Sequence, residues 1–178
     1  MLKTTELKEF LDEKVARYNN LKFIETDPIQ VPHAFTKKED IEIAAFLTAT
    51  IAWGNRKSII NNAKEMMQLL DNTPYDFVLN HSNQELKPLS KFVHRTFNSD
   101  DFIQFIKSLN HIYKNHGGLE NIFLRYKEEV SLQFSIHKLK HHFFEIDHLQ
   151  RTTKHISDPL RGSAAKRINI LIRIINAA

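Results

Sequence analysis

The stretch TKKEDIEIAAFLTATIAWGNRKSIINNAKEMMQLLDNTPYDFVL, residues Thr36–Leu79, decides the fold. Residues 37–53 within it are apolar nearly all round, which predicts a helix that is buried on every side. Thr36 and Glu39 have the spacing of a capping box, which predicts where this helix begins. Gly54-Asn55 breaks the pattern, and the apolar spacing of a second helix follows. The stretch therefore predicts a central buried helix with others packed around it.

Apolar residues keep helical spacing on both sides of this stretch, and no run shows sustained alternation. Four glycines and five prolines are few for 178 residues, which disfavours an all-β protein rich in turns. Pro28 and Pro32 predict that residues 19–35 run extended. We therefore expect an all-α fold with an N-terminal helix and an extended linker over residues 1–35, followed by a helical domain over residues 36–178.

The composition excludes several classes of function. The chain has no cysteine, which rules out a disulfide scaffold, thiolate metal centres and thiol catalysis. No uncharged apolar run reaches the ~18 residues that cross a bilayer, and no charged-then-apolar leader opens the chain. We expect a cytoplasmic protein without a membrane partner.

The formal net charge of +4 is concentrated near the C-terminus. The residues before position 148 carry nearly equal numbers of acidic and basic side chains. From position 148 onward, Asp158 is the sole acidic residue. A concentrated positive charge favours a polyanionic partner, although it is also compatible with a solvated face. The basic residues of this segment are Arg151, Lys154, Arg161, Lys166, Arg167 and Arg173.

Two expected helix starts carry cations where acids are usual. A helix N-terminus has a partial positive charge, so Lys or Arg in its first turn is unfavourable unless an anion binds there. A glycine beside each start would let a phosphate approach the backbone. The alternative is that these residues are ordinary solvated cations. The candidate phosphate-binding residues are Asn55, Arg56 and Lys57 at one start, and Arg161, Gly162, Ser163 and Arg167 at the other.

Aromatic and histidine residues offer further candidates. Trp53 stands beside the first basic turn, where it could stack on an extruded base, although core packing is the alternative. His94-Arg95 could contact phosphate. The residues His137, His141, Glu145 and His148 have helical spacing that could hold zinc, but a solvated helix face is the preferred interpretation. We therefore predict no metal site and no cofactor.

Four segments together resemble a bacterial family built on a domain of unknown function. They are Thr36–Leu79, KFVHRTFN at residues 91–98, HGGL at residues 116–119 and HISDPLRGSAAKRIN at residues 155–169. A more distant similarity links the chain to the helix-hairpin-helix DNA glycosylase superfamily. It is carried by Asp27-Pro28, by the buried helix ending at Trp53, and by a turn before Lys166 at the place of the superfamily's hairpin.

This second resemblance implies a helix-hairpin-helix DNA-glycosylase-like helical barrel that binds DNA. Lys166 would occupy the position of the lysine that attacks the sugar C1′ in glycosylase/lyase members. The hairpin lacks the usual second glycine, and Trp53-Gly54-Asn55-Arg56 replaces the glutamine-containing turn. The superfamily's catalytic aspartate lies beyond residue 178, so the chain resembles a shortened and inactive form.

Three functions follow from these observations. The first is a DNA-binding protein resembling base-excision-repair enzymes. The second is a non-catalytic nucleic-acid-binding module, and the third is a helical interaction protein whose basic tail only improves its solubility. In the glycosylase superfamily the N-terminal helix packs on the C-terminal segment. The apolar stripe of residues 4–18 would therefore lack its partner here and could drive self-association.

Overall fold

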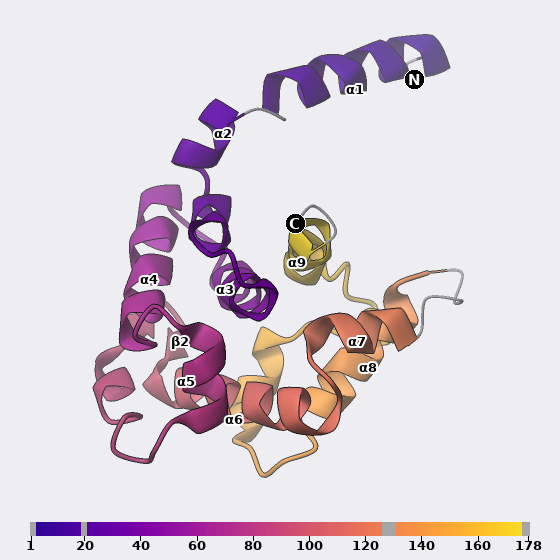
Figure 1. Cartoon of the computed structure of the whole chain (residues 1–178). Helices are drawn as coiled ribbons and strands as arrows, with labels where there is room; N and C mark the ends of the chain where they lie inside the picture. The colour runs from indigo at the N-terminus through magenta and orange to yellow at the C-terminus, as the bar shows by residue number, and fades with distance from the viewer. Residues whose placement is uncertain (1–2, 19–20, 126–130, 176–178) are drawn as a thin grey trace.

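The computed structural model describes residues 3–18, 21–125 and 131–175 and confirms an all-α protein (Figure 1). Its helices wrap around one apolar core, and the strands form a single short hairpin. The elements are α1 (Thr4–Tyr18), α2 (Leu21–Thr26), η1 (Pro28–Gln30), η2 (Pro32–Ala34), α3 (Lys38–Thr50), α4 (Arg56–Leu69), α5 (Pro74–Asn80), η3 (Pro88–Lys91), β1 (Val93–His94), β2 (Phe97–Asn98), α6 (Ser99–Asn115), α7 (Leu119–Arg125), α8 (Gln133–Phe143), η4 (Gln150–His155), η5 (Pro159–Arg161) and α9 (Lys166–Ile175).

Helix α3 is the central buried helix that the sequence predicts. Nine successive residues from Glu42 to Thr50 are buried, and Phe46 packs on Phe105 with ring centroids 5.7 Å apart. Figure 1 shows α9 beside α3, and these two helices share the most extensive helix–helix contact. The expected capping box is wrong, because Lys37 is the N-cap residue and no side chain caps the helix.

Residues 21–34 are not extended, which corrects the expectation that residues 19–35 run extended. They form α2 followed by the 3₁₀ turns η1 and η2. Pro28 and Pro32 each take the first position of a 3₁₀ turn, where the missing N–H group needs no partner. The Asp27 side chain caps η1 by accepting a hydrogen bond from the Ile29 N–H at 3.1 Å. Proline here begins short helical turns rather than preventing them.

The start of α6 anchors the C-terminal third of the chain. Asn98 and Asp101 form a reciprocal capping box, and Asp101 is fully buried. Its carboxylate accepts a hydrogen bond from Thr152 Oγ1 at 2.8 Å and pairs with Arg151 at 3.2 Å. His155 lies 3.3 Å from the same carboxylate. One buried acid thus fixes η4 against α6.

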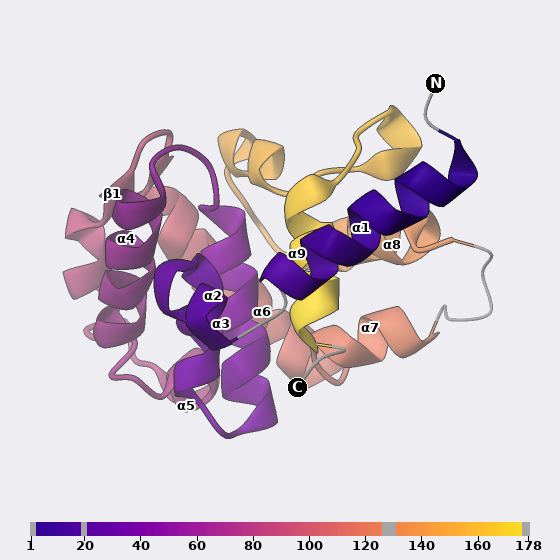
Figure 2. The same ribbon diagram turned by 90° about the horizontal axis from the view of Figure 1, so that it is seen from above.

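Helix α1 stands apart from the other helices in Figure 1, and in the view of Figure 2 it crosses over α9. Its apolar stripe is exposed, and self-association through this stripe stays a prediction. Within the described segments, no helix is long and apolar enough to span a membrane. The exposed side chains of the stripe are Leu7, Phe10, Leu11 and Val15.

Candidate nucleic-acid interface

The first basic helix start is the N-terminus of α4. Gly54 has a φ of +107°, a conformation that favours glycine, and it turns the chain from α3 into α4. Asn55 caps the helix, because its side-chain oxygen accepts a hydrogen bond from the Ser58 N–H at 3.2 Å. Arg56 and Lys57 occupy the exposed first turn, which contains no acid. The expected placement of these residues at a helix start is confirmed.

The second basic helix start is the N-terminus of α9. Lys166 is its exposed first residue, and Ser163 Oγ accepts a hydrogen bond from the Ala165 N–H at 3.2 Å just before it. Gly162 has a φ of +84° and ends η5 in the left-handed conformation. Arg161 belongs to η5 and lies 3.6 Å from the Asp158 carboxylate. Arg161 therefore precedes the α9 start by a separate turn rather than joining it.

Arg167 brings the two helix starts together. Its Nη1 atom donates a hydrogen bond to the Thr50 carbonyl oxygen at 2.6 Å, at the C-terminal end of α3. Its guanidinium lies over the Trp53 ring, 4.9 Å from the centroid. Arg167 is half-buried, so it joins α9 to α3 instead of presenting a free cation to solvent. This role was not predicted from the sequence.

The β1–β2 hairpin adds a further cation. Arg95 is an exposed residue of the hairpin turn, with a φ of +56°. A Cβ atom at Gly54 would collide with its guanidinium, so the glycine makes room for this arginine. Arg151 donates a hydrogen bond to the Thr96 carbonyl oxygen at 3.2 Å and ties η4 to the same turn.

His94 does not face solvent, so the expected phosphate contact of this histidine is wrong. It is 3% exposed, and its Nδ1 atom lies 2.6 Å from the Asn62 amide nitrogen. Its Nε2 atom lies 3.4 Å from the Trp53 carbonyl oxygen. Burial lowers the pKa of His94, although the hydrogen bond with Trp53 acts in the opposite direction. The neutral ring links the hairpin to the α3–α4 turn.

Trp53 is surrounded by side chains from three segments. In addition to Arg167, the His94 ring meets it edge-on at 5.2 Å, and the His155 ring stacks on it at 6.3 Å between centroids. Trp53 is partly buried and packs against the apolar core. Its proposed stacking on a base stays a prediction.

We use the name Trp53 surface for the set of residues that these contacts assemble. It combines the end of α3, the start of α4, the hairpin turn and the start of α9. Arg56 also pairs with Asp27, whose carboxylate oxygen lies 3.8 Å from its guanidinium. The members of the Trp53 surface are Trp53, Gly54, Asn55, Arg56, Lys57, Arg95, Lys166 and Arg167.

Asp158 has a structural role. Its carboxylate accepts a hydrogen bond from the Leu160 N–H at 3.1 Å and thereby caps η5. The same oxygen lies 3.1 Å from His137 Nδ1, and the side chain is only 7% exposed. The Asp158 carboxylate is thus engaged by η5 and His137 and does not serve Lys166 as a partner carboxylate.

The expected helical face of histidines does not form. Helix α8 ends at Phe143, before Glu145, and the His148 Nδ1 atom contacts the Ile146 carbonyl oxygen at 2.8 Å. His137 faces Asp158 instead of His141. Glu145 is instead the centre of a different cluster, which includes His111 of α6 and His116, its C-cap residue.

The fold and these contacts first define a class: an all-α protein in which two basic helix N-termini meet beside one tryptophan. The chain belongs to the family described as "Protein of unknown function (DUF2400)", which matches residues 27–175. This match confirms the expected family. Searches of curated proteins and of solved structures returned no match.

Proposed function

We propose that the chain binds DNA, and that the Trp53 surface contacts the phosphate backbone. The observation that carries the proposal is the convergence of exposed cations from three separate segments at two helix N-termini whose first turns contain no acid. Backbone N–H groups, helix dipoles and basic side chains all favour an anion at such a place. A regular array of phosphates would be bound by several of these cations together.

The proposed mode of binding follows that of the helix-hairpin-helix DNA glycosylase superfamily. The support is the turn after the buried helix α3 and the glycine turn that precedes Lys166. The segment before this turn consists of the short 3₁₀ elements η4 and η5 rather than a full α-helix. Because no full helix precedes the glycine turn, we assign phosphate binding to the part that follows the turn, namely Ser163, Lys166 and the N-terminal backbone of α9.

The direct test compares two double variants for binding to a short DNA duplex by fluorescence anisotropy. Arg56→Gln/Lys57→Gln removes two cations from the Trp53 surface, and Lys87→Gln/Lys107→Gln removes two exposed cations elsewhere. We expect the first to weaken binding roughly tenfold at low salt and the second to change it little. Equal losses in both variants, or no binding by the unaltered chain, would contradict the proposal.

We propose binding without base excision or lyase chemistry for this chain. Base excision needs a carboxylate to stabilise the sugar cation or to transfer protons, and Asp158, the acid nearest to Lys166 in the sequence, is already engaged in capping η5. Borohydride trapping on a duplex that contains an abasic site should yield no covalent adduct. An adduct that disappears in Lys166→Ala would instead establish lysine-dependent lyase activity.

A further inference from the structure

A cluster of histidines surrounds one carboxylate on the side of the fold where α6 and α8 end. His111 lies in the last turns of α6, and His116 is its C-cap residue. His142 lies in the last turn of α8, and Glu145 follows that helix by two residues. Segments separated by about thirty residues of chain thus direct polar groups to one point.

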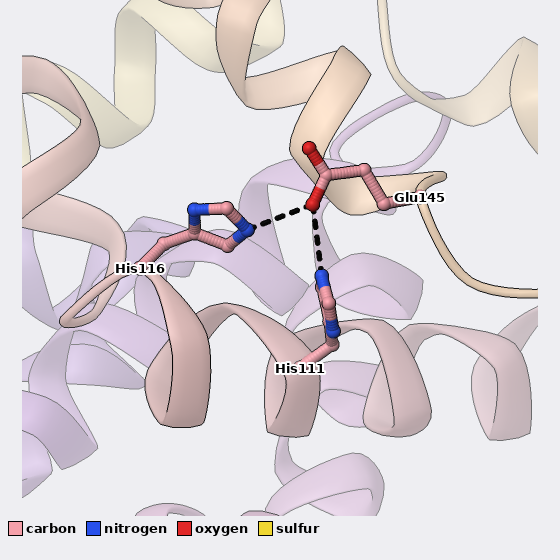
Figure 3. Close-up of side chains that lie close together, drawn as sticks. All are labelled: His111, His116 and Glu145. Atoms are coloured by element: carbon pink, nitrogen blue, oxygen red, sulfur yellow. Dashed lines mark hydrogen bonds and ion pairs between the residues drawn. The ribbon is translucent and has the colours of Figure 1, made fainter.

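The donor atoms are arranged around Glu145 with short separations. His111 Nε2 and His116 Nε2 lie 2.9 Å and 2.8 Å from Glu145 Oε2. Figure 3 shows both rings pointing toward this same oxygen. These three atoms all lie within 4.8 Å of one another. His142 Nδ1 lies 2.7 Å from the other oxygen, Oε1.

We propose that His111, His116 and Glu145 bind one divalent transition-metal ion of the zinc class, with His142 positioning the carboxylate. Two imidazoles and one carboxylate suit Zn²⁺ and Co²⁺, whereas Mg²⁺ and Ca²⁺ prefer sets of oxygen ligands. An ion about 2.0–2.2 Å from each donor requires donor atoms roughly 3.3 Å apart. The separations of His111 Nε2 and His116 Nε2 from Glu145 Oε2 reach that value if each opens by about half an ångström.

A second observation is a ring nitrogen without a partner. His142 Nε2 is buried and has no hydrogen-bond partner among the described residues, although the ring is 4.1 Å from that of His116, centroid to centroid. A buried polar atom without a partner is unfavourable and unusual in a folded protein. This unpartnered nitrogen beside the Glu145 cluster indicates that the region binds a further group in addition to forming its internal hydrogen bonds.

Metal binding through His111 requires Asn115 to change its hydrogen bond with the His111 ring. Its amide nitrogen lies 3.0 Å from His111 Nδ1 and donates a hydrogen bond of the same length to the His111 carbonyl oxygen. This contact favours the tautomer with the proton on Nε2. Coordination through Nε2 moves the proton to Nδ1, so Asn115 must rotate away or turn its oxygen to the ring. Asn115 is exposed and free to do so.

The bound ion would fasten the end of α6 to the segment after α8. Glu145 is 29% exposed, His111 22% and His116 14%, so the site lies close to the surface and can exchange its ion. Three protein ligands leave one tetrahedral position for water or another small ligand.

The test uses the full chain without a polyhistidine tag, freed of metal by a chelator. Calorimetric titration with Zn²⁺ should give one site per chain, and Co²⁺ should give the visible absorption of a low-coordinate complex. Zn²⁺ should raise the melting temperature and Mg²⁺ should not. Failure to bind either Zn²⁺ or Co²⁺ at micromolar concentrations would overturn the proposal and leave only a hydrogen-bonded cluster.

Variants identify the ligands, and circular dichroism verifies that each is folded. His116→Gln and Glu145→Gln should abolish binding, while His142→Ala should weaken it roughly 10–100-fold at unchanged stoichiometry. His33→Gln, which alters an exposed histidine outside the cluster, should have no effect. His141 also approaches Glu145, at 3.3 Å, but its side chain is 64% exposed. Loss of binding in His141→Ala with retention in His116→Gln would overturn the assigned ligand set. If Glu145→Gln fails to fold, the His116→Gln result decides.

Discussion

At the scale of single residues, Arg167 is the clearest case of a side chain whose role depends on its surroundings. Its position in a basic segment predicts a phosphate ligand, yet the structure gives it the Thr50 carbonyl oxygen and the Trp53 ring as partners. The sequence could not reveal this role, because both partners lie more than a hundred residues earlier. Arg95, by contrast, remains exposed, and its guanidinium lies beside Gly54.

Replacing Arg167 by Met should lower the free energy of unfolding by roughly 1.5–3 kcal/mol. The substitution keeps much of the side-chain volume but removes a charged hydrogen bond to a carbonyl at the end of α3 and the contact with Trp53. Chemical denaturation measures the change. An unaltered stability would mean that Arg167 does not join α9 to α3.

Two buried histidines predict a loss of stability on mild acidification. Burial lowers the pKa of both His94 and His155 below the ordinary 6.5, with hydrogen bonding to Trp53 and the Asp101 charge acting in the opposite direction. The unfolded chain therefore binds protons more readily than the folded one as pH falls below 6.5. Their contribution to stability is complete above pH 6.5 and decreases as pH falls toward the folded-state pKa values.

Denaturant unfolding between pH 8 and pH 5 measures this effect. We expect the free energy of unfolding to decrease below pH 6.5, by at most about 1.4 kcal/mol per histidine for each pH unit. His94→Asn should flatten the profile, whereas the exposed His33→Gln should leave its shape unchanged. A stability that stays constant or increases across this range would contradict the assignment.

At the scale of elements, the sequence predicts long helices well and short ones poorly. The buried helix α3 and the basic start of α4 have strong local signals, because apolar spacing and the break at Gly54-Asn55 act within a few positions, although the capping box expected for α3 does not form. The β1–β2 hairpin lacks such signals, and it packs on an element that is distant in the sequence, with His94 against Trp53 at 5.2 Å. The prolines of η1 and η2 suggest an extended segment but begin 3₁₀ turns instead.

Helix α1 predicts a test at the same scale. Leu11 and Val15 are 52% and 59% exposed on a helix that stands apart, so an apolar stripe is open to a second copy of the chain. We expect self-association that increases with concentration in sedimentation velocity, and we expect Leu11→Lys/Val15→Lys to abolish it. The melting temperature of the double variant should change little, because neither residue packs in the core.

The matched control for this prediction is Lys8→Ala, on the same helix in an exposed ion pair with Asp12. It should leave self-association unchanged, since such ion pairs contribute little. A chain that is monomeric at all concentrations would contradict the prediction.

At the scale of the whole molecule, the structure brings the basic segments together in a way that the sequence only suggests. The sequence predicts two separate helix starts, but their distance depends on the packing of α9 along α3, which involves residues more than a hundred positions apart. The histidine cluster could not be predicted for the same reason: Glu145 contacts α6 only in the folded chain. The side chain of Arg173, a further expected cation, lies outside the described residues.

The salt dependence of DNA affinity tests the central claim most directly. If Arg56, Lys57, Arg95 and Lys166 each contact one phosphate, the logarithm of the binding constant should fall with the logarithm of salt concentration with a slope of roughly −3 to −4. Arg56→Gln/Lys57→Gln should reduce the magnitude of that slope by about 2. A slope near zero, or an identical slope in the double variant, would contradict the assignment of DNA binding to the Trp53 surface.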